Sequence, residues 1–104
     1  MKRSSLLDQV KHAVHEVEPG AEIILYGSRS RGEAGAESDW DFLVLLDGPV
    51  DDARTDRVRH RLYEVEWASD EVISAVVRSR QTWRSHRSRA MPFHQQVERD
   101  GITL

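Results

Sequence analysis

The chain of 104 residues contains no cysteine, few aromatic residues and no long apolar run. Without cysteine it can form neither a disulfide nor a thiolate zinc site, and this composition favours a reducing, cytoplasmic compartment. No segment approaches the roughly 20 apolar residues that are needed to cross a bilayer. The N-terminus leads into an amphipathic pattern rather than the apolar core of a signal peptide. We therefore expect no association with a membrane.

An excess of basic charge is also absent. The 15 lysines and arginines are outnumbered by 18 acidic residues, and the formal net charge is −3. This balance argues against a dedicated nucleic-acid-binding protein. The arginine-rich stretch from Arg78 to Arg89, interrupted by Trp83, leaves RNA or an acidic partner as a weaker alternative to a solvated segment.

The length predicts one domain, residues 1–104, with one modest core. Apolar spacing, capping residues and breakers place helices and strands in alternation, which is typical of an α/β or α+β fold with a small sheet of three or four strands. The expected helices begin at Ser4 or Ser5, at Asp51 or Asp52 and at Pro92, and a single turn covers residues 81–84. The expected strands cover Ala21 to Tyr26, Trp40 to Leu46 and Val72 to Val77, and residues 102–104 form a tail.

The most informative segment is a glycine-bounded turn, Gly27-Ser28-Arg29-Ser30-Arg31-Gly32, followed by Ser38-Asp39-Trp40-Asp41 at the start of an apolar strand. Alternate strand residues share a face, so Asp39 and Asp41 point the same way and form a hard-oxygen site suited to Mg²⁺. The turn can bring backbone N–H groups, the hydroxyl of Ser28 and an arginine to a phosphate. Whether Arg29 or Arg31 faces the site is not determined by the pattern.

Two common phosphate-binding motifs do not fit this segment. A P-loop has Lys-Ser or Lys-Thr after its second glycine, whereas Glu33-Ala34 follows Gly32. The three glycines Gly27, Gly32 and Gly35 also lack the spacing of the dinucleotide fingerprint.

The motif formed by Gly27, Ser28, Gly32, Ser38, Asp39 and Asp41 resembles the signature of the minimal nucleotidyltransferase (MNT) family, in the DNA polymerase β-like superfamily. The resemblance implies a mixed sheet with helices packed on one side. It also implies Mg²⁺-dependent transfer of AMP from ATP to a protein acceptor, namely a tyrosine of a helical HEPN-type partner for which the chain acts as an antitoxin. Asp39 and Asp41 would be the catalytic metal ligands. The nucleotide-binding residues would be Gly27, Ser28, Arg29, Arg31 and Ser38.

One position departs from the family pattern. The resemblance implies a third carboxylate on the next strand, and Ser74 occupies that place. Glu71 has the opposite strand parity and would face the other way unless the strand starts later. This departure leaves two hypotheses open: a nucleotidyltransferase, or a catalytically weak or inactive domain of the same fold that acts by binding its partner.

Other residues carry weaker signals. His12 and His15 could touch one metal ion, but a solvated helix face is the preferred interpretation. Trp67 and Trp83 could form part of a subunit contact in a homo-oligomer, since aromatic residues are enriched at interfaces, and burial in the core is the default expectation.

Overall fold

The computed structural model describes residues 3–32 and 39–104, so the predicted nucleotide-binding residue Ser38 lies outside the described residues. Four strands and six helices form the described part of the chain. They are α1 (Arg3–Val17), β1 (Glu22–Tyr26), α2 (Ser28–Arg31), β2 (Trp40–Leu46), α3 (Asp52–Ser69), β3 (Ile73–Ser79), α4 (Arg80–Trp83), α5 (His86–Arg89), α6 (Pro92–Asp100) and β4 (Ile102–Thr103).

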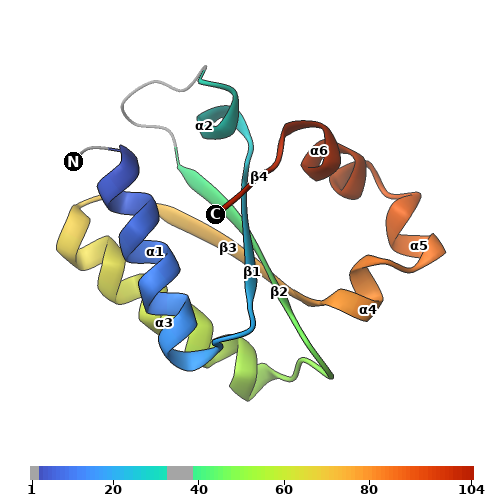
Figure 1. The fold of residues 1–104 in the computed structure, drawn as a ribbon, viewed down its shortest axis with the longest axis horizontal. Coiled ribbons are helices and arrows are strands. Elements are labelled where there is room, and N and C mark those ends of the chain that lie inside the picture. The colour runs from blue at the N-terminus through green and yellow to red at the C-terminus, as the bar shows by residue number, and fades with distance from the viewer. Residues whose placement is uncertain (1–2, 33–38) are drawn as a thin grey trace.

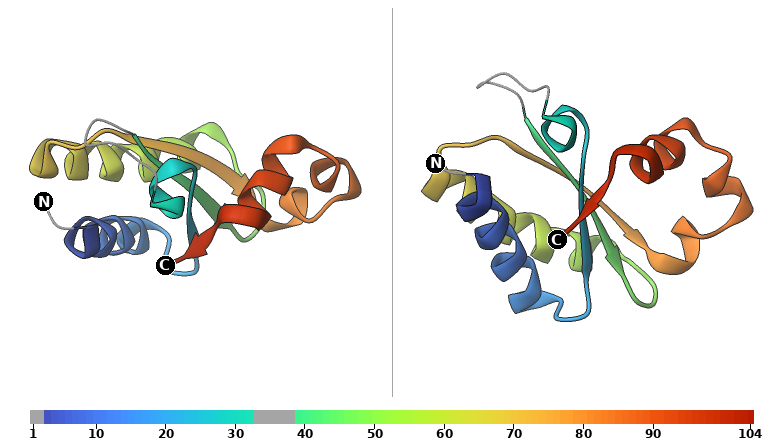
Figure 2. Two further views of the ribbon diagram at one scale, coloured as in Figure 1. Left: turned by 90° about the horizontal axis from the view of Figure 1, so that it is seen from above. Right: turned by 45° about the horizontal axis from the view of Figure 1, so that its top comes forward.

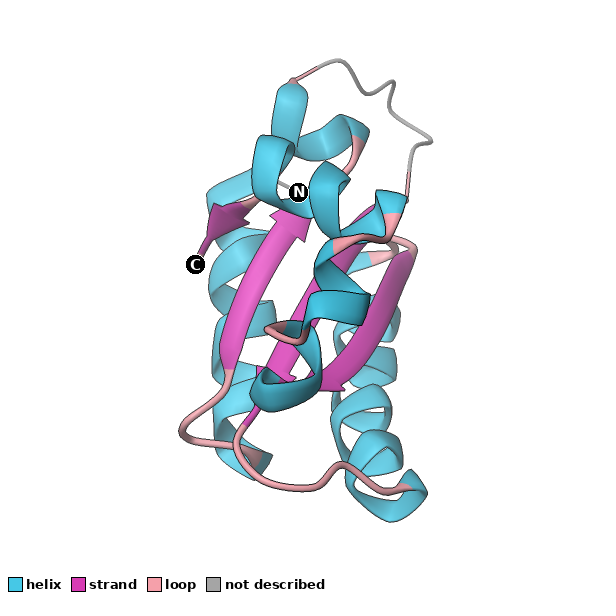
Figure 3. Ribbon diagram, turned by 90° about the vertical axis from the view of Figure 1, so that its right-hand side faces the viewer, coloured by secondary structure: helices cyan, strands magenta, loops and turns pink. Residues whose placement is uncertain are grey.

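The strands form one mixed sheet in the order β3-β2-β1-β4 (Figure 1). β2 runs antiparallel to β1 and parallel to β3, and the arrows of these three strands are visible in Figure 3. Among the described strands, only β2 pairs over at least five residues along both of its edges. It is almost entirely buried. Its apolar run explains this central position.

The two long helices cover one face of the sheet. α1 and α3 lie side by side, as Figures 1 and 2 show. Their inner stripes meet the strand residues that point to this face, because apolar residues at helical spacing form one buried stripe. The members of this larger core include Leu6, Val10, Val14, Phe42, Val44, Val58, Leu62 and Val65.

The opposite face carries a smaller core under the C-terminal helices. Leu43 and Leu45 of β2 pack there with Ile24, Trp83 of α4 and Val97 of α6. In Figure 3 the short helices lie in front of the sheet and the long helices behind it. The expectation of helices on one side therefore holds for the two long helices, while α4 and α6 add a cover on the other face.

The structure corrects two local expectations and adds one short helix that was not predicted. Residues 102–104 are not only a tail, because Ile102 and Thr103 pair with Leu25 and Ile24 as strand β4. The short helix α5 was not predicted, because residues 86–89 contain no apolar residue and so no apolar periodicity. Trp67 is 90% exposed rather than buried, because it lies off the inner stripe of α3. No helix within the described ranges is both long and apolar enough to span a membrane.

Candidate active site

Three oxygen-bearing side chains lie in a row across one end of the sheet. Asp41 of β2 pairs with Tyr26 of β1 on one side and with Ser74 of β3 on the other. Directly paired residues project to the same face, and this face is the one that carries the smaller core. The register thus places Ser74 directly beside Asp41.

The carboxylate of Asp41 lies tightly against Gly27. A Cβ atom at position 27 would sit 2.6 Å from Asp41 Oδ2, and Gly27 has φ +78°, a conformation that favours glycine. Burial, and secondarily the charge of Asp39, raise the pKa of the Asp41 carboxyl above its ordinary value. The two acids thus repel each other, as expected for ligands of a cation that would relieve the repulsion.

The turn after β1 is closed by its own polar groups. Both the backbone N–H and the hydroxyl of Ser30 donate to the carbonyl oxygen of Gly27, at 3.1 and 2.7 Å. Gly32 ends the short helix α2 in the left-handed conformation. Ser28 is half-buried at the first position of α2, directly after the glycine that touches Asp41. The structure thus brings Gly27, Ser28, Asp39 and Asp41 to one end of the sheet.

Arg29 is held on the other side of β2. Its guanidinium lies over the ring of Trp40, 4.4 Å from the centroid, and 3.9 Å from the carboxylate of Glu71. Trp40 Nε1 also donates to Glu71 Oε2, at 3.1 Å. Since Trp40 belongs to the larger core, these contacts tie Glu71 to the face opposite Asp41. Glu71 itself precedes β3, which begins at Ile73, so strand parity does not fix its direction.

Arg31 lies beside the C-terminal end of α6. Its Nη1 donates to Asp100 Oδ2 at 2.9 Å. Hydrogen bonds from Arg99 and Arg31 hold the pKa of the Asp100 carboxyl below its ordinary value. Arg29 and Arg31 each have a protein partner, and phosphate binding by either of them stays a prediction.

Tyr26 is the residue near the site that the sequence analysis missed. Burial raises the pKa of its phenol, the charge of Asp41 raises it further, and the charge of Arg78 lowers it. The phenol therefore stays protonated at neutral pH beside Asp41. Its position as the last strand residue before Gly27 could have drawn attention to Tyr26 in the sequence. Its pairing with Asp41, however, is known only from the register of β1 and β2.

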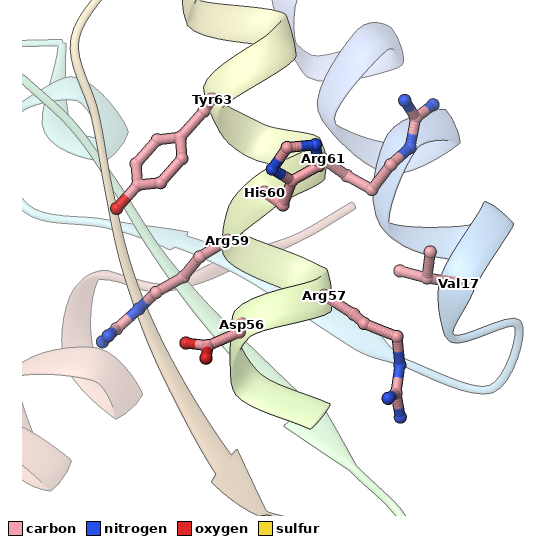
Figure 4. Close-up of a pocket in the computed structure, with 7 residues that line it drawn as sticks. All are labelled: Val17, Asp56, Arg57, Arg59, His60, Arg61 and Tyr63. Atoms are coloured by element: carbon pink, nitrogen blue, oxygen red, sulfur yellow. The ribbon is translucent and has the colours of Figure 1, made fainter. Parts of the chain in front are cut away.

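The other predicted features fall elsewhere. His12 pairs with Glu16 at 2.7 Å, and the ring of His15 bonds to the carbonyl of Ala21 at 3.0 Å, so these imidazoles have separate partners. Arg80, part of the arginine-rich stretch, is bound to Glu22 and Asp47. A hollow of about 530 Å³ lies on the outer surface of α3, away from Asp41 (Figure 4). Its side chains are Val17, Asp56, Arg57, Arg59, His60, Arg61 and Tyr63.

The residues present fit a magnesium ion shared with a substrate. Mg²⁺ is commonly bound by one or two carboxylates plus substrate phosphates, rather than by a complete protein cage. Asp39 and Asp41 supply two such carboxylates, and Gly27, which lacks a side chain, lets the carboxylate of Asp41 lie against the turn. No group of three or more histidine and acidic side chains suited to a metal occurs within residues 3–32 and 39–104, consistent with a serine at position 74.

Comparison with known proteins agrees with this geometry. Residues 7–91 match the family described as the nucleotidyltransferase domain. A search of curated proteins finds no match.

Three solved structures share the fold. A toxin–antitoxin crystal structure with AMP-PNP is 24% identical, with a TM-score of 0.66 over 92% of this chain and 69% of that chain. A complex of a tri-AMPylated Shewanella oneidensis HEPN toxin with its MNT antitoxin is 19% identical, with a TM-score of 0.64 over 98% and 71%. A mutant of the toxin–antitoxin MntA–HpeT, with two aspartates changed to glutamate, is 20% identical, with a TM-score of 0.63 over 99% and 72%.

At identities of 24% or less, the solved structures show a shared fold and nothing more. The family match covers residues 7–91, which include Gly27, Asp39 and Asp41. The resemblance inferred from the motif is confirmed: the chain belongs to the nucleotidyltransferase domain family, and its fold is that of the MNT antitoxins of HEPN toxin–antitoxin pairs.

Proposed function

We propose that the chain binds a nucleoside triphosphate, ATP in the first instance, and transfers AMP to a HEPN-type protein partner. The observation that carries this proposal is the acidic pair Asp39 and Asp41, of which Asp41 packs against Gly27, within a nucleotidyltransferase domain. The relatives in complexes with a HEPN toxin or with AMP-PNP support the choice of partner and nucleotide.

Each part of the site has a distinct role in this proposal. Asp39 and Asp41 would hold Mg²⁺, which when bound neutralises phosphate charge and orients the leaving pyrophosphate. Ser28 would donate its hydroxyl to a phosphate oxygen. Ser38 is proposed to assist in the same way. Arg29 and Arg31 are proposed as guanidinium donors, for which Arg31 would leave Asp100 and Arg29 would leave Trp40 and Glu71 on binding.

The serine at position 74 would limit the rate of AMP transfer. A serine beside Asp41 cannot accept the proton of the incoming hydroxyl as a carboxylate would. The transfer is then slow, or the domain acts mainly by contact with its partner. The second function, neutralisation by binding alone, is favoured by this one substitution.

The test is transfer of label from ATP. The chain is incubated with its HEPN-type partner, Mg²⁺ and α-labelled ATP, and the partner is analysed by mass spectrometry. We expect AMP on the partner, and a loss of about 100-fold or more with Asp41→Asn. Asp56→Asn, an exposed position on α3, is the matched control. Tight complex formation without label would refute the transfer and favour binding alone.

A further inference from the structure

A second group of polar side chains lies between α5 and α6, outside the candidate active site. Ser88 Oγ is 3.2 Å from His94 Nδ1, and His94 Nε2 is 2.8 Å from Glu98 Oε1. A carboxylate only accepts hydrogen bonds, so in the neutral ring the proton is on Nε2, and Nδ1 accepts from the hydroxyl of Ser88. This sequence of hydroxyl, base and orienting acid is the arrangement that activates a serine nucleophile.

The imidazole of His94 is fixed and almost fully enclosed. His94 is only 3% exposed and stacks on Trp83, with ring centroids 4.0 Å apart and planes 20° from parallel. Trp83 is in turn held by an edge contact with Phe93 at 5.7 Å. Burying a polar ring is unfavourable unless its nitrogens are bonded, so the two hydrogen bonds define its orientation.

A hollow beside the serine could accept a nucleotide. Ser88 and His94 line a space of about 260 Å³, together with two guanidinium groups and two aromatic rings, those of Arg78, Arg87, Trp83 and Phe93. Guanidinium groups pair with phosphate oxygens. Aromatic rings pack against planar bases. The chemical class that matches both is a phosphate ester of a nucleoside.

The hollow lies on the same face of the sheet as the acidic pair. Phe93, which lines the hollow, makes an edge contact of 5.3 Å with Tyr26. Tyr26 is the direct neighbour of Asp41 across the β1–β2 pair. A continuous series of ring contacts, from Tyr26 through Phe93 and Trp83 to His94, therefore links the candidate active site to Ser88.

We propose that Ser88 is a self-modification site whose Oγ accepts the nucleotidyl group. The Oγ–Pα bond forms while the bond from Pα to the oxygen that bridges to Pβ breaks, and pyrophosphate leaves with that electron pair. The hydroxyl proton moves to His94 Nδ1, and Glu98 stabilises the resulting imidazolium. This inference rests on the proposed function, because the Asp39 and Asp41 site, in the same molecule or in a second copy, must activate the triphosphate.

The first test omits the partner. The whole chain is incubated with Mg²⁺ and α-labelled ATP, and the modified peptide is mapped by mass spectrometry. We expect one AMP on Ser88, loss of this label in Ser88→Ala, and a decrease of about 100-fold in His94→Gln and about tenfold in Glu98→Gln. Ser5→Ala, an exposed serine on α1, is the control and keeps the label. If His94→Gln fails to fold, Glu98→Gln carries the test, because that carboxylate is 68% exposed.

A second test needs neither nucleotide nor metal. A fluorophosphonate probe should react with Ser88 in the wild type and not in His94→Gln. AMP on the partner with none on Ser88 would overturn this inference and leave the proposed function standing. AMP on neither protein would refute both. A Ser88 that is inert to the probe, or label that persists unchanged in Glu98→Gln, would also overturn the inference.

Discussion

The two faces of β2 differ in what their residues do, although the residues alternate along a single strand. Phe42 and Val44 face the long helices and are fully buried in the larger core. Asp41 and Leu43 face the other way, and that face changes from apolar to acidic at the beginning of the strand. Because neighbouring residues point to opposite faces, one strand can anchor the fold and present the site without separating the two functions in sequence.

Residues of β2 also differ in their effect on the stability of the fold. Apolar burial on the helix-covered face contributes to the free energy of unfolding. The acidic pair opposes folding, since burial and the charge of Asp39 disfavour the ionised form of Asp41. Phe42 and Asp41, which are neighbours on opposite faces, should therefore respond to mutation with opposite signs.

The largest expected effect is on the apolar face. Phe42→Ala should lower the free energy of unfolding by about 3–5 kcal/mol, because a fully buried ring is replaced by a cavity. Leu43→Ala, the next residue on the opposite face, removes less volume from the smaller core and should cost less. Chemical denaturation measures both, and a larger loss for Leu43→Ala would contradict the ranking of the two faces.

The glycine beside Asp41 gives the next largest effect. Gly27→Ala should cost about 1–3 kcal/mol and weaken Mg²⁺ binding, because its Cβ would displace the carboxylate of Asp41. Gly32→Ala is a matched control: its φ is +72°, but a Cβ there meets nothing within 4 Å. Thermal melts and metal titration distinguish the two. Equal metal affinity in both variants would show that the close contact at Gly27 is unimportant.

The third carboxylate can be restored. Ser74→Asp should raise Mg²⁺ affinity about tenfold and increase transfer, because the new acid would stand beside Asp41. Ser5→Asp, at an exposed position on α1, adds the same charge away from the site and controls for net charge. The measurement is metal-dependent labelling of the partner. An unchanged rate in Ser74→Asp would mean that the missing acid is not what limits the reaction.

The smallest effect is a gain in stability. Asp41→Asn should raise the free energy of unfolding at neutral pH by under about 1 kcal/mol, after screening by solvent. The folded-state pKa of Asp41 is raised above its ordinary value of 3.8, so the wild type loses stability as the pH rises from 3.8 through that raised pKa. The advantage of the variant should vanish below pH 3.8. Denaturation at several pH values tests this, and a destabilised variant at pH 7 would contradict the account.

Local sequence patterns were enough to predict the long helices and the three main strands. The strand from Trp40 to Leu46 was predicted with its observed bounds, and Asp51 caps α3 by accepting from the backbone N–H of Arg54. Capping and apolar runs act between near neighbours, so they can be read without coordinates.

Features that depend on distant pairing could not be predicted in the same way. The two-residue strand β4 exists only because β1 leaves an edge to pair with. The position of Tyr26 beside Asp41 follows from the register, and the contact of Ser88 with His94 follows from the packing of α5 on α6. The contact of Arg29 with Trp40 likewise joins α2 to β2, and the sequence motif does not determine which side chain Arg29 meets.

The most direct test of the central claim is calorimetry with ATP, with and without Mg²⁺, on the wild type and on Asp39→Asn/Asp41→Asn. If the two carboxylates and the adjoining turn hold a metal and a triphosphate together, the wild type should release heat that requires Mg²⁺, and the double variant should give only the heat of dilution. Metal-dependent heat of the same size in both proteins would contradict this account of the site.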